Sequence, residues 1–327
     1  MVNLRPRVFV TRQFFPEALE VLTGAADTEV WPDDEPPTPE QLLEKAGEAD
    51  GILTNIMDRI DADVFQAAHR LKVVSQLGVG VDNIDVAEAT RRGVLVGNTP
   101  GVLAKATADI AFAARRISEG DRWLRAGNWK MQYHPMVWLG AEIHGATLGI
   151  VGMGQIGVEM AKRARGFDMR VIYYSRTRKL ELEPELGMEY FEPSDLLSTA
   201  DFVTLHIPLT QETRHFIGER ELRLMKPTAI LINAARGAVV DSRALYTALK
   251  EGWISGAALD VTDPEPILPD DPLLTLDNLV ITPHIGSASI DSRRRTCLLA
   301  ARNVVAGIQG RRLEACANPE VYAAKGI

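Results

Sequence analysis

The stretch 147–157, TLGIVGMGQIG, decides the fold. Residues 147–151 are mostly apolar, as in a buried strand, and the pattern Gly-x-Gly-x-x-Gly begins directly after them at Gly152. A helical pattern starts near Gln155 and continues through 158–167, VEMAKRARGF. A strand that leads into a glycine-rich turn and then into a helix predicts a doubly wound α/β sheet that binds a dinucleotide.

The three glycines of this stretch have separate roles. Gly152 permits a tight turn, Gly154 lets the backbone approach a pyrophosphate, and Gly157 lets the helix pack closely on the strand. The helix then offers free N–H groups and a partial positive charge at Gln155 and Ile156. The bare pattern also fits an ordinary turn, but the strand and the helix around it favour a dinucleotide site.

Alternating strands and helices extend in both directions from this stretch. Segments typical of buried parallel strands recur along the chain at 7–11, 49–54, 71–78, 93–98, 147–152, 169–174, 201–207, 228–233, 255–260 and 278–282. The passage between the two series lies near 98–101, and the helical segment 292–310 could pack back on the first series. We therefore expect two α/β domains, one formed by 1–98 with 288–327 and one by 99–287.

Length, charge and cysteine content exclude several classes of protein. A chain of 327 residues suits two domains of roughly 100–200 residues each. A net charge of −8 argues against nucleic acid as a partner. The N-terminus lacks a signal-peptide core, and no apolar run reaches about 18 residues, so no membrane partner is expected. Cys297 and Cys316 cannot build a disulfide framework, and no His, Asp and Cys cluster predicts a metal; a reducing cytoplasm is the simplest location.

The residues after the second strand of the nucleotide-binding series predict the cofactor. An Asp or Glu that binds the ribose of NAD is expected roughly 20 residues after the glycines. The sequence instead has Ser175, Arg176, Thr177 and Arg178, a combination that suits a 2′-phosphate. We expect NADP(H) to be preferred and NAD(H) to be possible, although a solvated basic turn would have the same sequence.

Arg236, Glu265 and His284 each follow a strand of the same predicted sheet. Open α/β sheets bind their ligands at this carboxyl edge. Taken singly, each residue has an ordinary interpretation: a surface ion pair, a loop charge and a satisfied strand-end histidine. Three such residues at the edge that holds the dinucleotide favour an active site.

With these residues, the chain resembles the D-isomer-specific 2-hydroxyacid dehydrogenases, and within them the glyoxylate/hydroxypyruvate reductases. The matching segments span most of the chain in the family's order: LGVGVDNID, NTPGVL, TLGIVGMGQIG, INAARGAVVD, ALDVTDPEP and TPHIGSAS. The resemblance implies a Rossmann-like cofactor domain and a flavodoxin-like substrate domain, with the active site in the cleft between them. It also implies a homodimer formed mainly through the cofactor domains.

The resemblance implies reduction of a small 2-ketoacid to the D-2-hydroxyacid. Arg236 would bind the carboxylate and the α-oxygen of the substrate, because a guanidinium pairs with a carboxylate in bidentate fashion. His284 would be the general acid, since histidine titrates near neutrality. Glu265 would hold the other imidazole nitrogen.

Further site residues follow from the same resemblance. The positions that match cofactor contacts are Pro208, Ala234, Asp260 and Gly286. The positions that match substrate contacts are Val79, Gly80 and Ser287. Trp138 resembles a tryptophan that reaches the active site of the partner subunit, and a buried interface aromatic is the alternative. His206 ends a strand near the cofactor and could pack there.

Other functions remain open. A 2-ketogluconate reductase of the same family, or a dinucleotide-sensing protein similar to the corepressors of this superfamily, would carry the same three residues. The chain also departs from the family pattern after NTPGVL, where ATADIAFAARRI is short by roughly five residues, more than one helical turn. In relatives this helix links the domains and contributes to the dimer interface.

Overall fold

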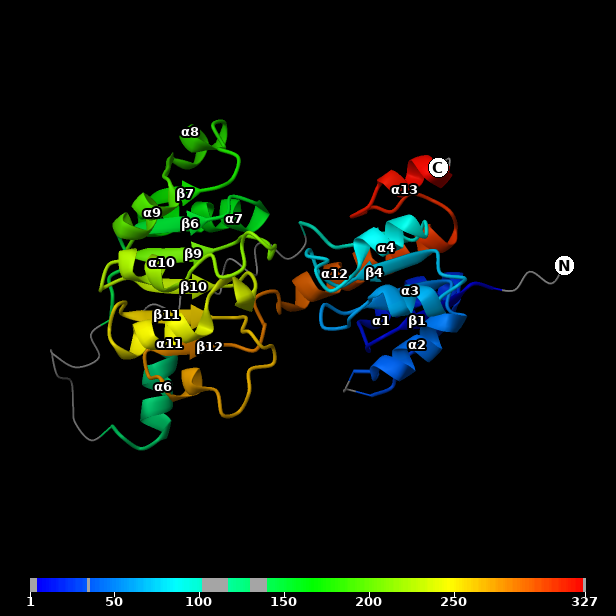
Figure 1. Cartoon of the computed structure of the whole chain (residues 1–327), viewed down its shortest axis with the longest axis horizontal. Helices are drawn as coiled ribbons and strands as arrows, with labels where there is room; N and C mark the ends of the chain where they lie inside the picture. Colours follow the sequence, from blue (N-terminus) through cyan, green and yellow to red (C-terminus); the bar gives the residue numbers. More distant parts are fainter. Residues whose placement is uncertain (1–4, 34–35, 102–116, 130–139, 326–327) are drawn as a thin grey trace. The chain divides into compact units, whose positions relative to one another are not determined.

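The computed structural model describes residues 5–33, 36–101, 117–129 and 140–325. The chain divides into an N-terminal unit, Met1–Leu103 with Ser289–Ile327, and a central unit, Ala104–Ala288. Within the described ranges each unit contains one parallel sheet, with strand order β2-β1-β3-β4-β5 in the first and β12-β11-β10-β9-β6-β7-β8 in the second (Figure 1). The predicted fold class is confirmed. The assignment of substrate to one unit and cofactor to the other remains a prediction.

The N-terminal unit places helices on both faces of its sheet. Its strands are β1 (Arg7–Val10), β2 (Asp27–Val30), β3 (Gly51–Thr54), β4 (Val73–Gln76) and β5 (Leu95–Gly97). Its helices are α1 (Pro16–Ala25), α2 (Pro39–Glu48), α3 (Ala62–Ala67), α4 (Val86–Arg91), α12 (Ile290–Ile308) and α13 (Glu320–Lys325). Buried side chains of α1 and α12 cover one face, and those of α2, α3 and α4 cover the other.

The expected return of the chain after the last strand of the central unit is confirmed. Helix α12 packs on the N-terminal sheet through Ala300, Val304 and Ile308. Gly307 allows the close approach, because a Cβ there would lie 2.5 Å from the side chain of Val73. The sequence did not predict β2, whose residues DTEV are polar and partly exposed as the edge strand of this sheet.

The central unit repeats the layered arrangement with a longer sheet. Its strands are β6 (Thr147–Val151), β7 (Arg170–Tyr174), β8 (Met188–Tyr190), β9 (Phe202–Leu205), β10 (Ile230–Asn233), β11 (Gly256–Leu259) and β12 (Leu279–Ile281). Its α-helices are α6 (Ile117–Arg125), α7 (Gln155–Ala164), α8 (Leu182–Leu186), α9 (Pro193–Thr199), α10 (Glu219–Leu224) and α11 (Ser242–Lys250). Its short 3-10 helices are η2 (Arg165–Phe167), η3 (Gly237–Val239) and η4 (Pro272–Thr275). The six strands predicted here are confirmed, while the three-residue edge strand β8 was missed because it is too short for a periodic signal.

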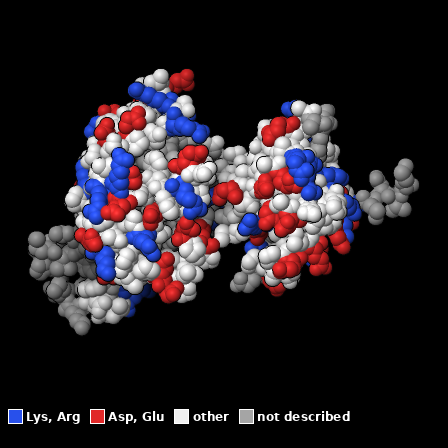
Figure 2. All heavy atoms as spheres, viewed as in Figure 1, with Lys and Arg blue, Asp and Glu red and all other residues white. Residues whose placement is uncertain are grey.

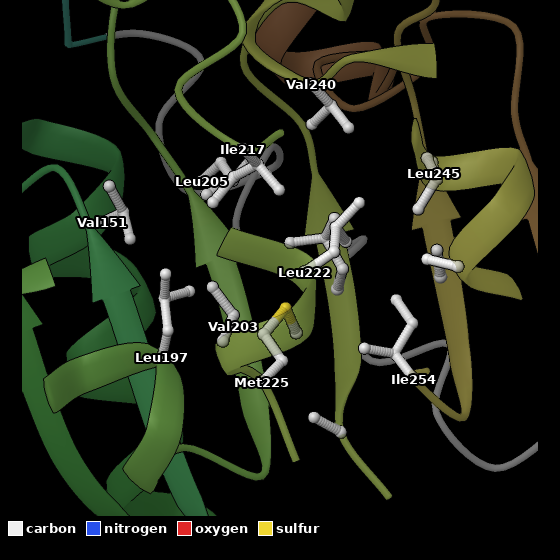
Figure 3. Packing of buried hydrophobic residues seen from close by; sticks show 14 of the residues in the cluster. Val151, Leu197, Val203, Leu205, Ile217, Leu222, Met225, Val240, Leu245 and Ile254 are labelled. Atoms are coloured by element: carbon white, nitrogen blue, oxygen red, sulfur yellow. The ribbon is translucent and has the colours of Figure 1, made fainter. Parts of the chain in front are cut away.

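Apolar cores on both faces hold the central sheet rigid. Figure 3 shows one of them, in which Val203 and Leu205 of β9 pack with Leu222 of α10 and Leu245 of α11. The core on the other face includes residues of β6 and α7: Leu148, Ile150, Met160 and Ala161. Removing a fully buried leucine such as Leu222 from this packing costs about 2–5 kcal/mol. The strand ends that carry the polar loops are therefore fixed from both sides.

The described surface carries both signs of charge. Figure 2 shows Lys and Arg interspersed with Asp and Glu over the visible face of each unit. Among the helices that the structure describes, none has the length and apolar character needed to cross a bilayer. The same part of the chain contains no group of three His, Cys, Asp or Glu side chains arranged to hold a metal ion.

Candidate active site

The glycine loop between β6 and α7 has the shape that a bound dinucleotide requires. Gly152 has φ of +103°, and a Cβ there would lie 2.6 Å from the backbone oxygen of His206. A Cβ on Gly157 would lie 2.2 Å from the oxygen of Gly152. A Cβ on Gly154 would meet no atom of the neighbouring structure within 4 Å, so this side of the loop is open to a ligand. Helix α7 begins at Gln155 without a side-chain cap, which fits the binding of a pyrophosphate at its N-terminus.

The loop after β7 begins directly beside the first glycine. The N–H of Gly152 donates to the backbone oxygen of Tyr174 across 2.8 Å, and Ser175 to Arg178 follow. Arg178 donates to both oxygens of Glu183, at 2.7 and 2.9 Å. Its guanidinium also lies 5.4 Å from the ring of Tyr190. The predicted phosphate-binding Arg178 is therefore already engaged by its own chain.

The Glu183 carboxylate accepts several hydrogen bonds near this loop. It accepts from the hydroxyl of Tyr173 across 2.8 Å, and that hydroxyl accepts from the N–H of Lys179 across 2.7 Å. Hydrogen bonds, first from Arg178 and then from Tyr173, lower the pKa of Glu183 to about 2. Arg176, in contrast, is exposed and makes no salt bridge within the described residues. The two predicted phosphate-binding arginines differ in availability, which the sequence did not reveal.

His284 and Glu265 form a close pair at the carboxyl edge of the central sheet. The Nδ1 atom of His284 lies 2.6 Å from an oxygen of Glu265, and both side chains are about one quarter exposed. His284 follows β12 with a left-handed backbone, φ 52°, and its N–H donates to the backbone oxygen of Asp260 across 3.0 Å. With Nδ1 occupied by the carboxylate, Nε2 is the nitrogen that can exchange a proton with a ligand.

Asp260 holds the loop that carries His284. Its carboxylate is 5% exposed and accepts from the hydroxyl of Thr282 at 2.6 Å and the N–H groups of Ile285 and Gly286 at 2.8 and 2.7 Å. Oδ1 accepts from Thr282 and Ile285, on either side of His284, and Oδ2 accepts from Gly286. The sequence pointed to a cofactor contact for Asp260 and Gly286 and missed this role in shaping the loop.

Arg236 lies in a tight turn between β10 and η3. The side chain of Asn233 donates to the backbone oxygen of Arg236 across 2.9 Å and accepts from the N–H of Ala235 across 3.1 Å. After the turn, a Cβ on Gly237 would lie 1.9 Å from the backbone oxygen of Thr262, so only glycine fits. The predicted cofactor contact at position 234 lies inside this turn. Asn233 was not predicted, although an Asn at a strand end is a typical turn-forming residue.

The end of β9 contributes a second histidine to the same edge. His206 is half-buried, and its Nε2 atom lies 3.0 Å from the hydroxyl oxygen of Thr204. Burial lowers the pKa of His206 to about 4, so the ring is neutral at pH 7. Pro208 follows in the exposed turn, where its backbone oxygen accepts from the hydroxyl of Thr213 across 2.7 Å.

The predicted substrate loop of the N-terminal unit follows β4. The side chain of Gln76 is fully buried and donates to the backbone oxygen of Gly80, while Val79 is 39% exposed. Asn98 donates to the backbone oxygen of Val79 across 2.9 Å. Ser287 lies in the loop before α12. Trp138 and most of the shortened segment after NTPGVL lie outside the described residues, and their predicted roles stay predictions.

Comparisons with known proteins find relatives along most of the chain. Residues 107–286 match the family described as "D-isomer specific 2-hydroxyacid dehydrogenase, NAD binding domain". The chain is 51% identical to glyoxylate reductase of Korarchaeum cryptofilum over 312 residues, which cover 94% of each chain. It is 53% identical over 315 residues to glyoxylate reductase of Aeropyrum pernix, again with 94% of each chain covered.

Solved structures share the fold of the chain. The NADPH-dependent glyoxylate/hydroxypyruvate reductase of Sinorhizobium meliloti, solved with NADP and malonate, has a TM-score of 0.82 and 30% identity, and the match covers 96% of this chain and 97% of that one. A protein of Thermus thermophilus reaches a TM-score of 0.88 at 44% identity over 95% of this chain and 99% of its own. The similarity therefore extends over both units and is not confined to the glycine loop.

Proposed function

We propose, because this chain belongs to the D-isomer specific 2-hydroxyacid dehydrogenase family, that it reduces glyoxylate or hydroxypyruvate to the D-2-hydroxyacid and prefers NADPH. The observation that carries the proposal is the 2.6 Å hydrogen bond between His284 and Glu265 at the carboxyl edge of the sheet that also carries the glycine loop. A carboxylate on Nδ1 fixes the orientation of the ring and leaves Nε2 to face a ligand, which suits a group that exchanges a proton through Nε2.

In this proposal, separate residues of the central unit bind the substrate and transfer the proton. A nicotinamide dinucleotide, when bound at the glycine loop, would supply the hydride for the reduction. Arg236 binds the carboxylate of the ketoacid, because its planar guanidinium can donate two parallel hydrogen bonds. His284 gives the proton that the carbonyl oxygen needs, and in the reverse direction it takes that proton back. Glu265 holds Nδ1 and orients the ring.

The remaining site residues are proposed on the family resemblance. The backbone N–H groups of Val79 and Gly80 and the hydroxyl of Ser287 would contact the substrate. Pro208 and the backbone at position 234 would line the cofactor site beside the glycine loop. Trp138 would act in the partner's site of a homodimer, and the two free cysteines, Cys297 and Cys316, suit the reducing cytoplasm.

Cofactor preference rests on the loop after β7. Ser175, Arg176 and Thr177 offer two hydroxyls and a guanidinium, with no carboxylate among them. Such donors pair with a 2′-phosphate, whereas NAD would leave them facing water. The Sinorhizobium meliloti relative is described as NADPH-dependent, which supports the same preference here.

A turnover assay tests the proposal. Purified protein is mixed with glyoxylate, hydroxypyruvate or 2-ketogluconate, and the absorbance of NADPH and NADH is followed for each pair. We expect turnover of the first two acids, a higher kcat/KM with NADPH, and a product of D configuration by chiral chromatography. Tight dinucleotide binding without turnover of any acid would instead identify a dinucleotide-sensing protein, and best turnover of 2-ketogluconate would reassign the substrate.

A further inference from the structure

Asn233 occupies an unusual place beside the proposed substrate-binding arginine. It is the last residue of β10, in the middle of the seven-stranded sheet, and its side chain is 1% exposed. The amide makes two hydrogen bonds, donating to the oxygen of Arg236 and accepting from the N–H of Ala235. Both functional atoms of a fully buried side chain are thus used on the turn that carries Arg236.

The backbone of Asn233 is also hydrogen-bonded, through Asp260, to the loop that carries His284. Its C=O accepts from the N–H of Asp260 across 2.9 Å, and the C=O of Asp260 accepts from the N–H of His284 across 3.0 Å. A continuous series of hydrogen bonds therefore joins the backbone of Arg236 to that of His284 through two residues. Because both intermediates are buried, little freedom remains between these two backbones.

We propose that Asn233 is a positioning residue that sets the place of Arg236 relative to His284. The inference rests on the proposed function, in which Arg236 binds the ketoacid carboxylate and His284 protonates its carbonyl oxygen. The two groups must contact atoms of one small molecule, so their relative position decides whether both contacts form together. The rigid sheet fixes His284 through Asp260, and the Asn233 side chain fixes Arg236 to the same sheet.

Loss of the amide has a specific consequence. Without it, the N–H of Ala235 and the C=O of Arg236 lose their side-chain partner, and the turn relaxes while Gly237 keeps its contact with Thr262. Displacements of about 1 Å in a site can cost about 100-fold in rate. We therefore expect Asn233→Ala to raise the KM for the ketoacid about tenfold or more, with a smaller fall in kcat.

Three variants separate positioning from folding. Asn233→Ala removes both hydrogen bonds. Asn233→Asp keeps the acceptor for Ala235 and replaces the donor to Arg236 with a second oxygen. Asn278→Ala is the matched control. The Asn278 amide also donates to backbone oxygens, those of Leu249 and Ser255 at 3.2 and 3.4 Å. Asn278 directly precedes β12, so it lies at the amino ends of the strands, away from the proposed site at their carboxyl ends.

The measurements are the KM for glyoxylate, the affinity for oxamate in the presence of NADPH, and the midpoint of thermal unfolding. We expect both Asn233 variants to weaken ketoacid and oxamate binding at least tenfold. We expect Asn278→Ala to lower only the unfolding midpoint. If Asn233→Ala does not fold, Asn233→Asp carries the test, since it preserves volume and one of the two bonds.

A double-mutant cycle shows whether Asn233 acts through Arg236. In an Arg236→Ala background, Asn233→Ala should change kcat/KM less than about twofold. Equal effects in both backgrounds, or an unfolding midpoint that falls while both KM and oxamate affinity stay normal, would overturn the inference. Failure of the proposed function is a separate outcome, because it appears as absent turnover in the unsubstituted protein before any variant is made.

Discussion

Each unit has a buried aspartate that accepts hydrogen bonds at the edge of its sheet, and the two aspartates differ in whether a cation pairs with them. Asp58, in the N-terminal unit, and Asp260, in the central unit, are each 5% exposed. Asp58 accepts from the hydroxyls of Thr11 and Thr54 at 2.5 and 2.9 Å, and forms an ion pair with Arg12 at 3.0 Å. Asp260 accepts only from neutral donors, and among the described residues no cation lies within salt-bridge distance of it.

We expect this difference in partners to correspond to a difference in role, with Asp58 important for stability and Asp260 for the loop that carries the proposed proton donor. A buried charge without a counter-charge is costly, even when hydrogen bonds compensate much of the desolvation. The three hydrogen bonds that Asp260 accepts all come from the residues around His284, so its place in the fold is explained by that loop. Asp58, with its cation, ties the end of β1 to the end of β3, while Asp260 shapes the loop around His284.

The largest expected effect lies in the central unit. Because a positioned general acid contributes about 10²–10⁴-fold, we expect His284→Ala to lower kcat by that factor with glyoxylate and NADPH. Glu265→Gln, which keeps the shape of the side chain, should lower kcat less. His144 is the matched control, since it faces Asp168 at 3.5 Å but both side chains are at least 70% exposed. A similar loss of kcat in His144→Ala would break the assignment.

Substitutions of the two aspartates give the next largest effects. We expect one to lower mainly the stability of the fold and the other mainly the activity. Asp58→Asn removes one partner of a buried ion pair, so we expect the free energy of unfolding to fall by about 3 kcal/mol, with kcat close to normal. Asp260→Asn should lower kcat/KM by roughly 10–100-fold through displacement of the His284 loop, and destabilise the fold less. Urea denaturation and steady-state kinetics on both variants test this.

The comparison fails in either of two ways. One is an Asp260→Asn variant that keeps kcat/KM while losing more stability than Asp58→Asn. The other is an Asp58→Asn variant that folds normally but is inactive, since that result would move the functional carboxylate to the N-terminal unit.

The loop after β7 offers a smaller effect that contrasts two neighbouring arginines. We expect Arg176→Ala to raise the KM for NADPH roughly tenfold, with the KM for NADH unchanged, because an exposed guanidinium is available to a 2′-phosphate. Arg178→Ala should change that KM less, since Glu183 already holds Arg178 at 2.7 Å. Steady-state kinetics with both cofactors distinguish them, and a greater effect of Arg178→Ala on NADPH alone would reverse the ranking.

Site positions that follow from a local sequence motif could be predicted here. Contacts between residues that are distant in sequence could not. The glycine loop and the strand-end positions of Arg236, Glu265 and His284 follow from local patterns, because the carboxyl ends of parallel strands share one edge. The ring contact of Arg178 needs Tyr190, which lies in a strand too short to predict, and the ion pair of Asp58 needs Arg12 from 46 residues away.

Two histidines at the same sheet edge give the last and smallest effect. His284 has a carboxylate partner, whereas His206 has the hydroxyl of Thr204 and a buried Nδ1 atom with no hydrogen-bond partner in the described structure. Burial lowers the pKa of His206 to about 4 from its usual 6.5. Between these values the unfolded chain binds a proton that the folded chain does not, so His206 makes stability fall as the pH decreases.

We expect this histidine to cost about 1 kcal/mol of unfolding free energy between pH 7 and pH 5.5. His206→Gln removes the titration and keeps a polar side chain, so the variant should lose less stability than the unsubstituted protein over that range. Urea denaturation at the two pH values measures the difference. An identical pH dependence in both proteins would mean that the folded chain protonates His206 as readily as the unfolded chain does.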